Sequence, residues 1–140
     1  MAQFTANAIQ TVAIGQNTLF TETPVCGSCW IMHREDSGIV TLRAPQNQCA
    51  RFLVEFSGNI AVATGGTVGA ISVAIAIDGE PVQSANMIVT PAAIGDYFNV
   101  SSQAYINVPC GCCVTVAVEN TSAATAIDVQ NANLTVSRVC

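Results

Sequence analysis

The chain has 140 residues, of which 51% are hydrophobic and only 9% are charged, and its formal net charge is −5. A length of this order fits one domain that can bury a core without help from metals or disulfides. The acidic balance, with no lysine among the four basic residues, excludes the basic patch that nucleic-acid binding requires. A surface with so few charges is typical of a chain that is partly covered by a partner, so we expect an oligomer.

Three stretches carry no charged residue and are long enough to cross a membrane, at 1–21, 57–77 and 97–118. Each is interrupted by polar residues or glycines, so we interpret all three as strands and loops and expect no membrane partner. The first stretch has neither a basic start nor a continuous apolar centre, and we therefore expect no signal peptide.

Short alternating or apolar runs, bounded by Gly, Pro, Asn and Asp, recur along the whole chain and predict strands. In chain order the predicted strands are 8–14, 18–21, 30–33, 39–43, 51–56, 71–77, 81–89, 97–100, 105–108, 113–119 and 134–139. Asp78-Gly79 is a strong hairpin signal between two of them. The glycine-rich stretch 63–70 indicates a long loop, since it has neither the lysine nor the following helix of a phosphate loop.

Strands of this length and spacing predict an all-β fold, an antiparallel β-sandwich of the jelly-roll kind with about eight to ten strands. We expect a single domain over residues 1–140. Within it, residues 1–24 form either an N-terminal docking arm or a first strand.

The alternation within 71–77 and 113–119 suggests where subunits meet. One face of the first run carries large apolar residues, and the other carries Ser72, Ala74 and Ala76 instead of charges. A sheet with one wet face would alternate with polar residues. We therefore expect the small-residue face to pack against a symmetric neighbour, with a loop of the same chain as the alternative cover. The predicted core and subunit-contact residues are Ile71, Val73, Ala74, Ile75, Ala76, Val114 and Val116.

Seven cysteines are the most conspicuous chemical feature of the chain: Cys26, Cys29, Cys49, Cys110, Cys112, Cys113 and Cys140. The first two have the CxxC spacing of a zinc or redox pair, but the group at 110–113 does not have the spacing of a second zinc knuckle. We expect no metal and no cofactor. We interpret the cysteines as intrachain disulfides, interchain links (Cys140 above all) or free thiols, and the odd number leaves at least one thiol unpaired within the chain.

Seven cysteines in a chain that we expect to have no leader raise the question of compartment, because cytosolic thiols stay reduced. A protein that is made in the cytosol and exposed later, by lysis or by spore release, would reconcile the two observations.

No catalytic set can be assigned, so we expect no enzyme. His33, the only histidine, lies in the charged run His33–Asp36, where we expect a solvated surface residue, with a ligand role as the alternative. The carboxylates are scattered and suggest no catalytic pair. The aromatic residues Trp30, Tyr97 and Tyr105 are interpreted as core or interface residues, with a sugar-binding platform as the alternative.

The order of motifs from Arg51 to Val139 resembles the C1q/TNF-type jelly roll. The matching features are "FLVEF", the hairpin "ISVAIAIDGEPV", the strand "INVPCGCCVTVAVEN" after a proline-glycine corner, and the closing "ANLTVSRV". "QTVAIGQNTLFTET" at 10–23 resembles the first strand of such modules. Similar domains end the exosporium collagen-like glycoproteins of spore formers, and small phage proteins that decorate heads or form fibres have a similar arrangement. The resemblance implies a homotrimer with both termini near one end, and it implies no catalytic residue.

These observations predict a trimeric structural protein on the outside of a particle. A phage virion protein comes first: it would be made in the host cytoplasm and would dock on the major capsid protein or another particle protein. A spore or cell-surface coat protein comes second, because no Gly-X-Y stalk precedes the domain. A glycan- or receptor-binding lectin-like module and a zinc-bound β domain are further alternatives. If Ala74 and Ala76 line the subunit contact, Ala74→Arg or Ala76→Arg should break assembly before it breaks the fold.

Overall fold

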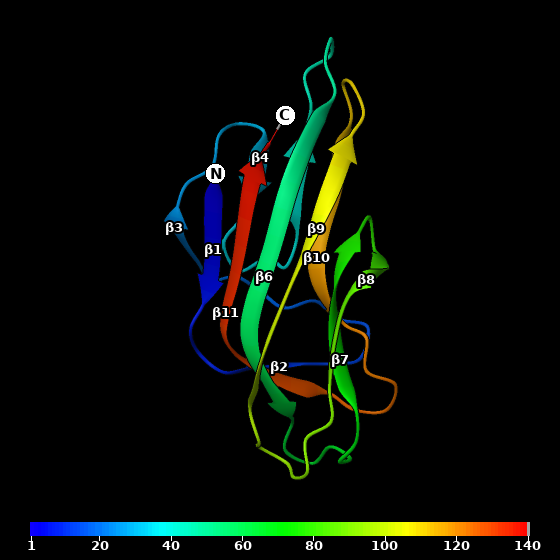
Figure 1. The fold of residues 1–140 in the computed structure, drawn as a ribbon. Coiled ribbons are helices and arrows are strands. Elements are labelled where there is room, and N and C mark those ends of the chain that lie inside the picture. Colours follow the sequence, from blue (N-terminus) through cyan, green and yellow to red (C-terminus); the bar gives the residue numbers. More distant parts are fainter. Residues whose placement is uncertain (140) are drawn as a thin grey trace.

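Two antiparallel sheets packed face to face make up the computed structural model, which describes residues 1–139 (Figure 1). One sheet has the strand order β3-β1-β11-β6-β9, with β2 also paired to β11, and the other has the order β4-β5-β10-β7-β8. The strands in these residues are β1 (Ala2–Ala6), β2 (Gln10–Val12), β3 (Glu22–Val25), β4 (Ile31–His33), β5 (Val40–Arg43), β6 (Ala50–Val62), β7 (Ile71–Ile77), β8 (Glu80–Val89), β9 (Phe98–Val108), β10 (Cys113–Asn120) and β11 (Ile127–Arg138). The all-β sandwich predicted from the sequence is confirmed.

The core lies between the sheets because the long strands turn one row of apolar side chains inward. In β6 the inward row includes Phe52, Val54 and Phe56, which are buried, while Arg51 and Glu55 are exposed on the other face. Burying one such apolar side chain contributes roughly 1.5–3 kcal/mol relative to leaving it in water. A register slip of one residue would exchange the two rows, so this alternation fixes which face of the strand is inside.

The hairpin between β7 and β8 follows the signal in the sequence. Asp78 and Gly79 both have positive φ, 51° and 87°, which is the backbone of a two-residue type I′ turn. The Asp78 carboxylate also accepts hydrogen bonds from the Thr115 backbone amide at 2.9 Å and from its hydroxyl at 3.2 Å. The turn is thereby tied to β10 as well as to its own two strands.

The N-terminal strands differ from the sequence prediction. The predicted strand 8–14 shrinks to β2, and β1 was missed because its alternating pattern is only five residues long. Residues 18–21 do not form a strand; in and beside this segment the structure has the isolated bridges Asn17↔Glu119 and Phe20↔Ser37. Residues 1–139 therefore contain eleven strands, one more than the upper end of the expected range.

The predicted strands 97–100 and 105–108 are parts of one strand, β9, which pairs with β6 from end to end. The sequence suggested a break because Ser101, Ser102 and Gln103 are polar. In the structure Ser101 and Gln103 are exposed on the outer face, and Ser102 is a small half-buried residue of the inner row. A strand whose outward side chains are hydroxyls and amides therefore has the same composition as a loop.

Both chain ends lie at the same end of the sandwich, as the resemblance implied (Figure 1). Ala2, at the start of β1, pairs with Val136, near the finish of β11. The antiparallel pairing then brings the start of β6, the finish of β9 and the start of β10 to this end as well. No helix of residues 1–139 is long and apolar enough to cross a membrane.

Candidate functional site

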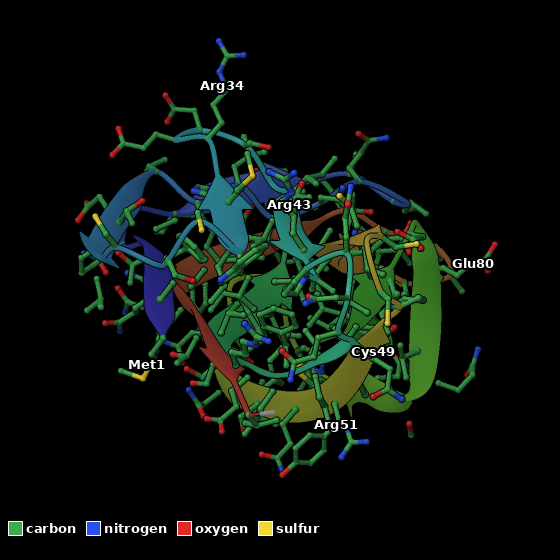
Figure 2. The ribbon with its side chains drawn as sticks, turned by 90° about the horizontal axis from the view of Figure 1, so that it is seen from above. Met1, Arg34, Arg43, Cys49, Arg51 and Glu80 are labelled. Carbon is green, nitrogen blue, oxygen red and sulfur yellow. The ribbon has the colours of Figure 1, made fainter. Side chains whose placement is uncertain are left out.

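The end of the sandwich that holds both chain termini also holds the cysteines of the described chain. Three segments meet there: the β3–β4 loop with Cys26 and Cys29, the β5–β6 loop with Cys49, and the β9–β10 turn with Cys110 and its neighbours. Figure 2 looks down on this end, with Cys49 labelled. The six described cysteines, Cys26, Cys29, Cys49, Cys110, Cys112 and Cys113, are all exposed. We call this surface the cysteine end; Cys140 lies outside the described residues.

The β5–β6 loop and the β9–β10 turn are held together by backbone hydrogen bonds. The Gly111 amide donates to the Pro45 carbonyl at 2.8 Å, and the Ala44 amide donates to the Cys112 carbonyl at 3.1 Å. Gly111 has a φ of 70°, a left-handed conformation that glycine adopts without strain. The loop and the turn therefore present their cysteines from one hydrogen-bonded unit.

Within that unit, the sulfurs of Cys49 and Cys110 lie 2.8 Å apart. The hydrogen bond to Cys49, followed by burial, raises the pKa of the Cys110 thiol above its ordinary value. Across residues 1–139, no group of three or more His, Cys, Asp or Glu side chains is placed to hold a metal ion. The closest pair of thiols in the described chain is therefore Cys49 and Cys110.

The strands predicted to make the subunit contact are buried within a single chain. Ile71, Val73, Ile75, Val114 and Val116 belong to the core. Ala74 and Ala76 have 0% and 2% of their surface exposed without any second subunit. Whether these residues also contact a neighbour stays a prediction, but their burial does not require one.

The small-residue face of β7 is covered by its own chain. Ala74 lies beside Glu119 of β10 on one side and Asn86 of β8 on the other. At Ser72, the loop after β10 folds back over the strand: the Ser72 amide donates to the Ser122 hydroxyl at 2.9 Å, and the Ser72 and Thr121 hydroxyls are 2.7 Å apart. The alternative cover considered from the sequence, a loop of the same chain, therefore accounts for Ser72.

The outer row of β9, on the six-stranded sheet, is polar but carries no charge, a feature that the sequence reasoning missed. The residues of this row are Asn99, Ser101, Gln103, Tyr105 and Asn107, all exposed. We call the outward side of β6, β9 and β11 the amide face. Its signal in the sequence was the alternation of polar uncharged residues with apolar ones in 98–108.

A shallow hollow of about 380 Å³ lies on the amide face. Glu55 supplies the single charged group of its lining, which is otherwise made of Phe56, Ser57, Ser101, Ser102, Gln103, Asn133 and Thr135. Hydroxyls and amides both donate and accept hydrogen bonds, so such a surface can bind polar groups of a protein partner or the hydroxyls of a sugar.

Large apolar side chains are exposed along β8 and β9, the two strands that form one edge of the sandwich. Tyr105 and Ile88 have 66% and 64% of their surface exposed, and Phe98 has 44%. We call these three residues the β8–β9 edge. The opposite edge, formed by β3 and β4, exposes Val25 and Met32. Exposed apolar side chains on an edge strand leave apolar area that a partner can cover.

His33 is not the solvated surface residue that the sequence suggested. It is half-buried, its ring centroid lies 4.6 Å from that of Phe4 and 6.3 Å from that of Phe20, and Nε2 is 2.9 Å from the Ser37 carbonyl oxygen. The expectation failed because the turn beside it folds against the first sheet. His33 thus helps to seal one side of the core.

The three aromatic residues considered for a sugar platform lie apart. Trp30 precedes β4 at the cysteine end, packs partly against the core and has the Arg138 guanidinium 5.9 Å from its ring centroid. Tyr97 precedes β9 at the far end, where burial and then the Asp128 carboxylate raise its pKa. Tyr105 stands on the amide face. The structure does not bring these residues into one platform.

The N-terminal residues 1–24 contribute to the sandwich in the described chain. β1 lies between β11 and β3, and Phe4, Val12 and Phe20 are buried. Docking or exchange of this segment onto a neighbouring subunit stays a prediction.

Solved structures share this fold at low sequence identity. The globular domain of zebrafish complement 1qA protein is 13% identical with a TM-score of 0.65, and the match covers 99% of this chain and 96% of that one. The Eiger TNF of S. frugiperda is 12% identical with a TM-score of 0.67, over 99% and 91%. Murine APRIL is 9% identical with a TM-score of 0.62, over 97% and 98%. No protein-family model and no curated protein matches the chain. The fold is therefore a C1q/TNF-like jelly roll, as the sequence resemblance indicated.

Proposed function

We propose that this chain is a non-enzymatic structural protein that assembles as a homotrimer on the outside of a particle, in the first place a phage virion. Its work would be binding: to further copies of itself and to the major capsid protein or another particle protein. The jelly-roll fold and the absence of an assignable catalytic set in the sequence support a role of this kind.

The observation that carries the oligomer is the pair of apolar edges on a charge-poor sandwich. In a cyclic oligomer each copy offers two different surfaces, one to each neighbour. The β8–β9 edge and the opposite β3–β4 edge are two such surfaces, and both expose large apolar side chains. The number three comes from the C1q/TNF-type resemblance.

The virion is supported by the resemblance to small phage head and fibre proteins. The shared end of the two termini and the cysteines gives the sandwich a polarity. Docking through the cysteine end would leave the opposite end pointing away from the particle. A spore or cell-surface coat protein would use the same geometry on a different particle.

Native mass spectrometry of the purified chain tests the assembly. We expect a trimer mass at micromolar concentration, without bound metal, in the presence and absence of reductant. A monomer at all concentrations, or a monomer that carries stoichiometric zinc, would contradict the proposal.

Immunogold electron microscopy tests the location. An antibody against the chain should label phage particles released by the source culture and leave spores and cell surfaces unlabelled. Labelling of spores alone would replace the virion with the spore coat.

A glycan- or receptor-binding role is the second candidate, favoured by the hollow on the amide face. Gln103, Asn133 and Glu55 offer amide and carboxylate groups there, and Tyr105 stands two positions from Gln103 on the same row. Binding to a defined sugar class on a glycan array, lost in Gln103→Ala and retained in Gln83→Ala on the exposed part of β8, would favour this role.

A further inference from the structure

We propose that Cys49 and Cys110 form an intrachain disulfide, which covalently ties the β5–β6 loop to the β9–β10 turn at the cysteine end. The two sulfurs lie 2.8 Å apart across 61 residues of sequence. A disulfide requires about 2.05 Å between sulfurs, so a small adjustment of two exposed side chains separates the thiol pair from the bond. This inference does not depend on the oligomer or on the particle.

The surrounding backbone already holds the two cysteine-bearing segments side by side. Ala50 and Val108 are paired at the last rung of the β6–β9 ladder; Cys49 lies one position beyond it on one side, and Cys110 lies two positions beyond it on the other. The hydrogen bond from the Gly111 amide to the Pro45 carbonyl holds the loop against the turn just past the two cysteines. The bond would therefore extend the existing ladder and would not pull separate elements together.

Cys49 and Cys110 are distinguished from the other described cysteines by this contact. Cys26, Cys29, Cys112 and Cys113 are exposed at the same end, and within residues 1–139 none of them makes a comparable sulfur–sulfur contact. Cys112 and Cys113 are adjacent in sequence, so in an extended chain their side chains point to opposite faces. The sequence alone could not select a pair among seven cysteines, and the three-dimensional contact does.

The bond forms by thiol–disulfide exchange with a small disulfide such as oxidised glutathione. The thiolate of one cysteine attacks a glutathione sulfur, which gives a mixed disulfide and releases one glutathione thiolate. The thiolate of the second cysteine then attacks the protein sulfur of that mixed disulfide, which forms the Cys49–Cys110 bond and releases the second glutathione. Two protein thiols are oxidised, one glutathione disulfide is reduced to two thiols, and the two cysteine protons end on the released glutathione or in solvent. Because the pKa of Cys110 is raised, its thiolate is scarce at neutral pH, and exchange should accelerate as the pH rises.

Peptide mapping of the full chain after treatment with oxidised glutathione tests the pairing. Free thiols are alkylated under denaturing conditions before cleavage with trypsin. The arginines place Cys49 alone in the peptide 44–51, and Cys110, Cys112 and Cys113 together in 52–138. We expect these two peptides to be linked in wild type, Cys112→Ser and Cys113→Ser, and unlinked in Cys110→Ser. The denatured, non-reduced Cys140→Ser variant, which lacks the cysteine expected to link chains, should have the mass of one chain.

Thermal unfolding gives an independent readout. A loop of this size predicts that reduction of wild type lowers Tm by about 10 °C. Cys49→Ser and Cys110→Ser should have the Tm of reduced wild type, and reductant should not change it. Reductant should lower the Tm of Cys112→Ser as it does that of wild type. Recovery of 44–51 with Cys49 alkylated would overturn the proposal. So would a link that survives in Cys110→Ser but not in Cys112→Ser, or a covalent dimer mass that persists in Cys140→Ser. If a serine variant does not fold, peptide mapping of the wild-type chain still decides whether Cys49 is linked to the 52–138 peptide. The native mass of the same sample tests the trimer separately.

Discussion

Two apolar regions of this sandwich differ in what covers their side chains. On the outer face of β7 the apolar residues are small, and Ala74 and Ala76 are buried by neighbouring strands of the same chain. On the β8–β9 edge they are large, and Tyr105 and Ile88 are mostly exposed. The folded single chain buries the first region, whereas the second leaves apolar area that a partner can cover.

The comparison shows what small residues on a strand indicate. They allow close approach, but the approaching group can be the next side chain in the same sheet as well as a second subunit. The β7 face illustrates the first case, since Glu119 and Asn86 flank Ala74. An interface hypothesis is therefore stronger on residues that the folded single chain leaves exposed.

The largest effect is expected at the buried face. Ala74→Arg inserts a long charged side chain where no surface is exposed, and we expect a loss of about 3 kcal/mol or more in the free energy of unfolding. Circular dichroism during thermal melting measures it. Ser84→Arg, at an exposed position of β8, is the matched control and should melt like wild type. A folded monomer with unchanged Tm would restore the original expectation that Ala74 serves assembly before folding.

The next largest effect is expected at the exposed edge, and it concerns assembly. Tyr105→Glu should weaken the trimer by about 2 kcal/mol or more, a dissociation concentration raised roughly thirty-fold, because a charge replaces an apolar contact. Native mass spectrometry over a dilution series measures it, and circular dichroism should show an intact fold. Val68→Glu, an exposed apolar residue in the loop 63–70, is the control. A trimer that tolerates Tyr105→Glu at every dilution would remove this edge from the interface.

A smaller loss of stability is expected at Asn120, a buried residue with a side-chain amide at the end of β10. The Asn120 side chain donates to the Val12 carbonyl at 3.0 Å and accepts from the Ser122 amide at 2.9 Å. Asn120→Ala should cost about 2 kcal/mol, because it leaves buried backbone groups without partners. Urea unfolding measures the loss. Asn99→Ala on the exposed amide face should cost much less, and equal costs would contradict the distinction.

The smallest effect is expected at the hairpin that connects β7 to the edge strand β8. Gly79 has a φ of 87°, so Gly79→Ala places a side chain in a conformation that costs about 1 kcal/mol. Gly69→Ala is the control, because its added Cβ meets open space and Gly69 does not have a positive φ. Chemical denaturation of both variants should separate them. Indistinguishable stabilities would mean that the turn tolerates the strain.

The sequence predicted the sandwich because alternation and turn residues are local properties. The extents of 71–77 and its hairpin were right, since that strand is apolar on one face and small on the other. The joining of 97–100 with 105–108 was missed because polar residues on an open sheet face have the composition of a loop. β1 was missed because five residues carry too little pattern.

The interaction surfaces were harder to predict than the fold. The exposure of Ile88 and Tyr105 depends on β8 and β9 lying at an edge, which is a property of sheet order and cannot be read from either strand alone. The closeness of Cys49 and Cys110 likewise depends on the pairing of β6 with β9. The sequence indicated which residue types would matter, but it did not predict which residues would lie next to them in the fold.

The shared location of the chain ends and the cysteines has a consequence for how the molecule can be modified. The loop 63–70 and the loop before β9 lie at the opposite end (Figure 1), and Gly65 and Val68 are exposed there. Exposed loop tips tolerate inserted sequence far better than strands do. A foreign peptide inserted after Val68 would project from the tip farthest from both termini, which makes this sandwich a natural carrier for displayed epitopes.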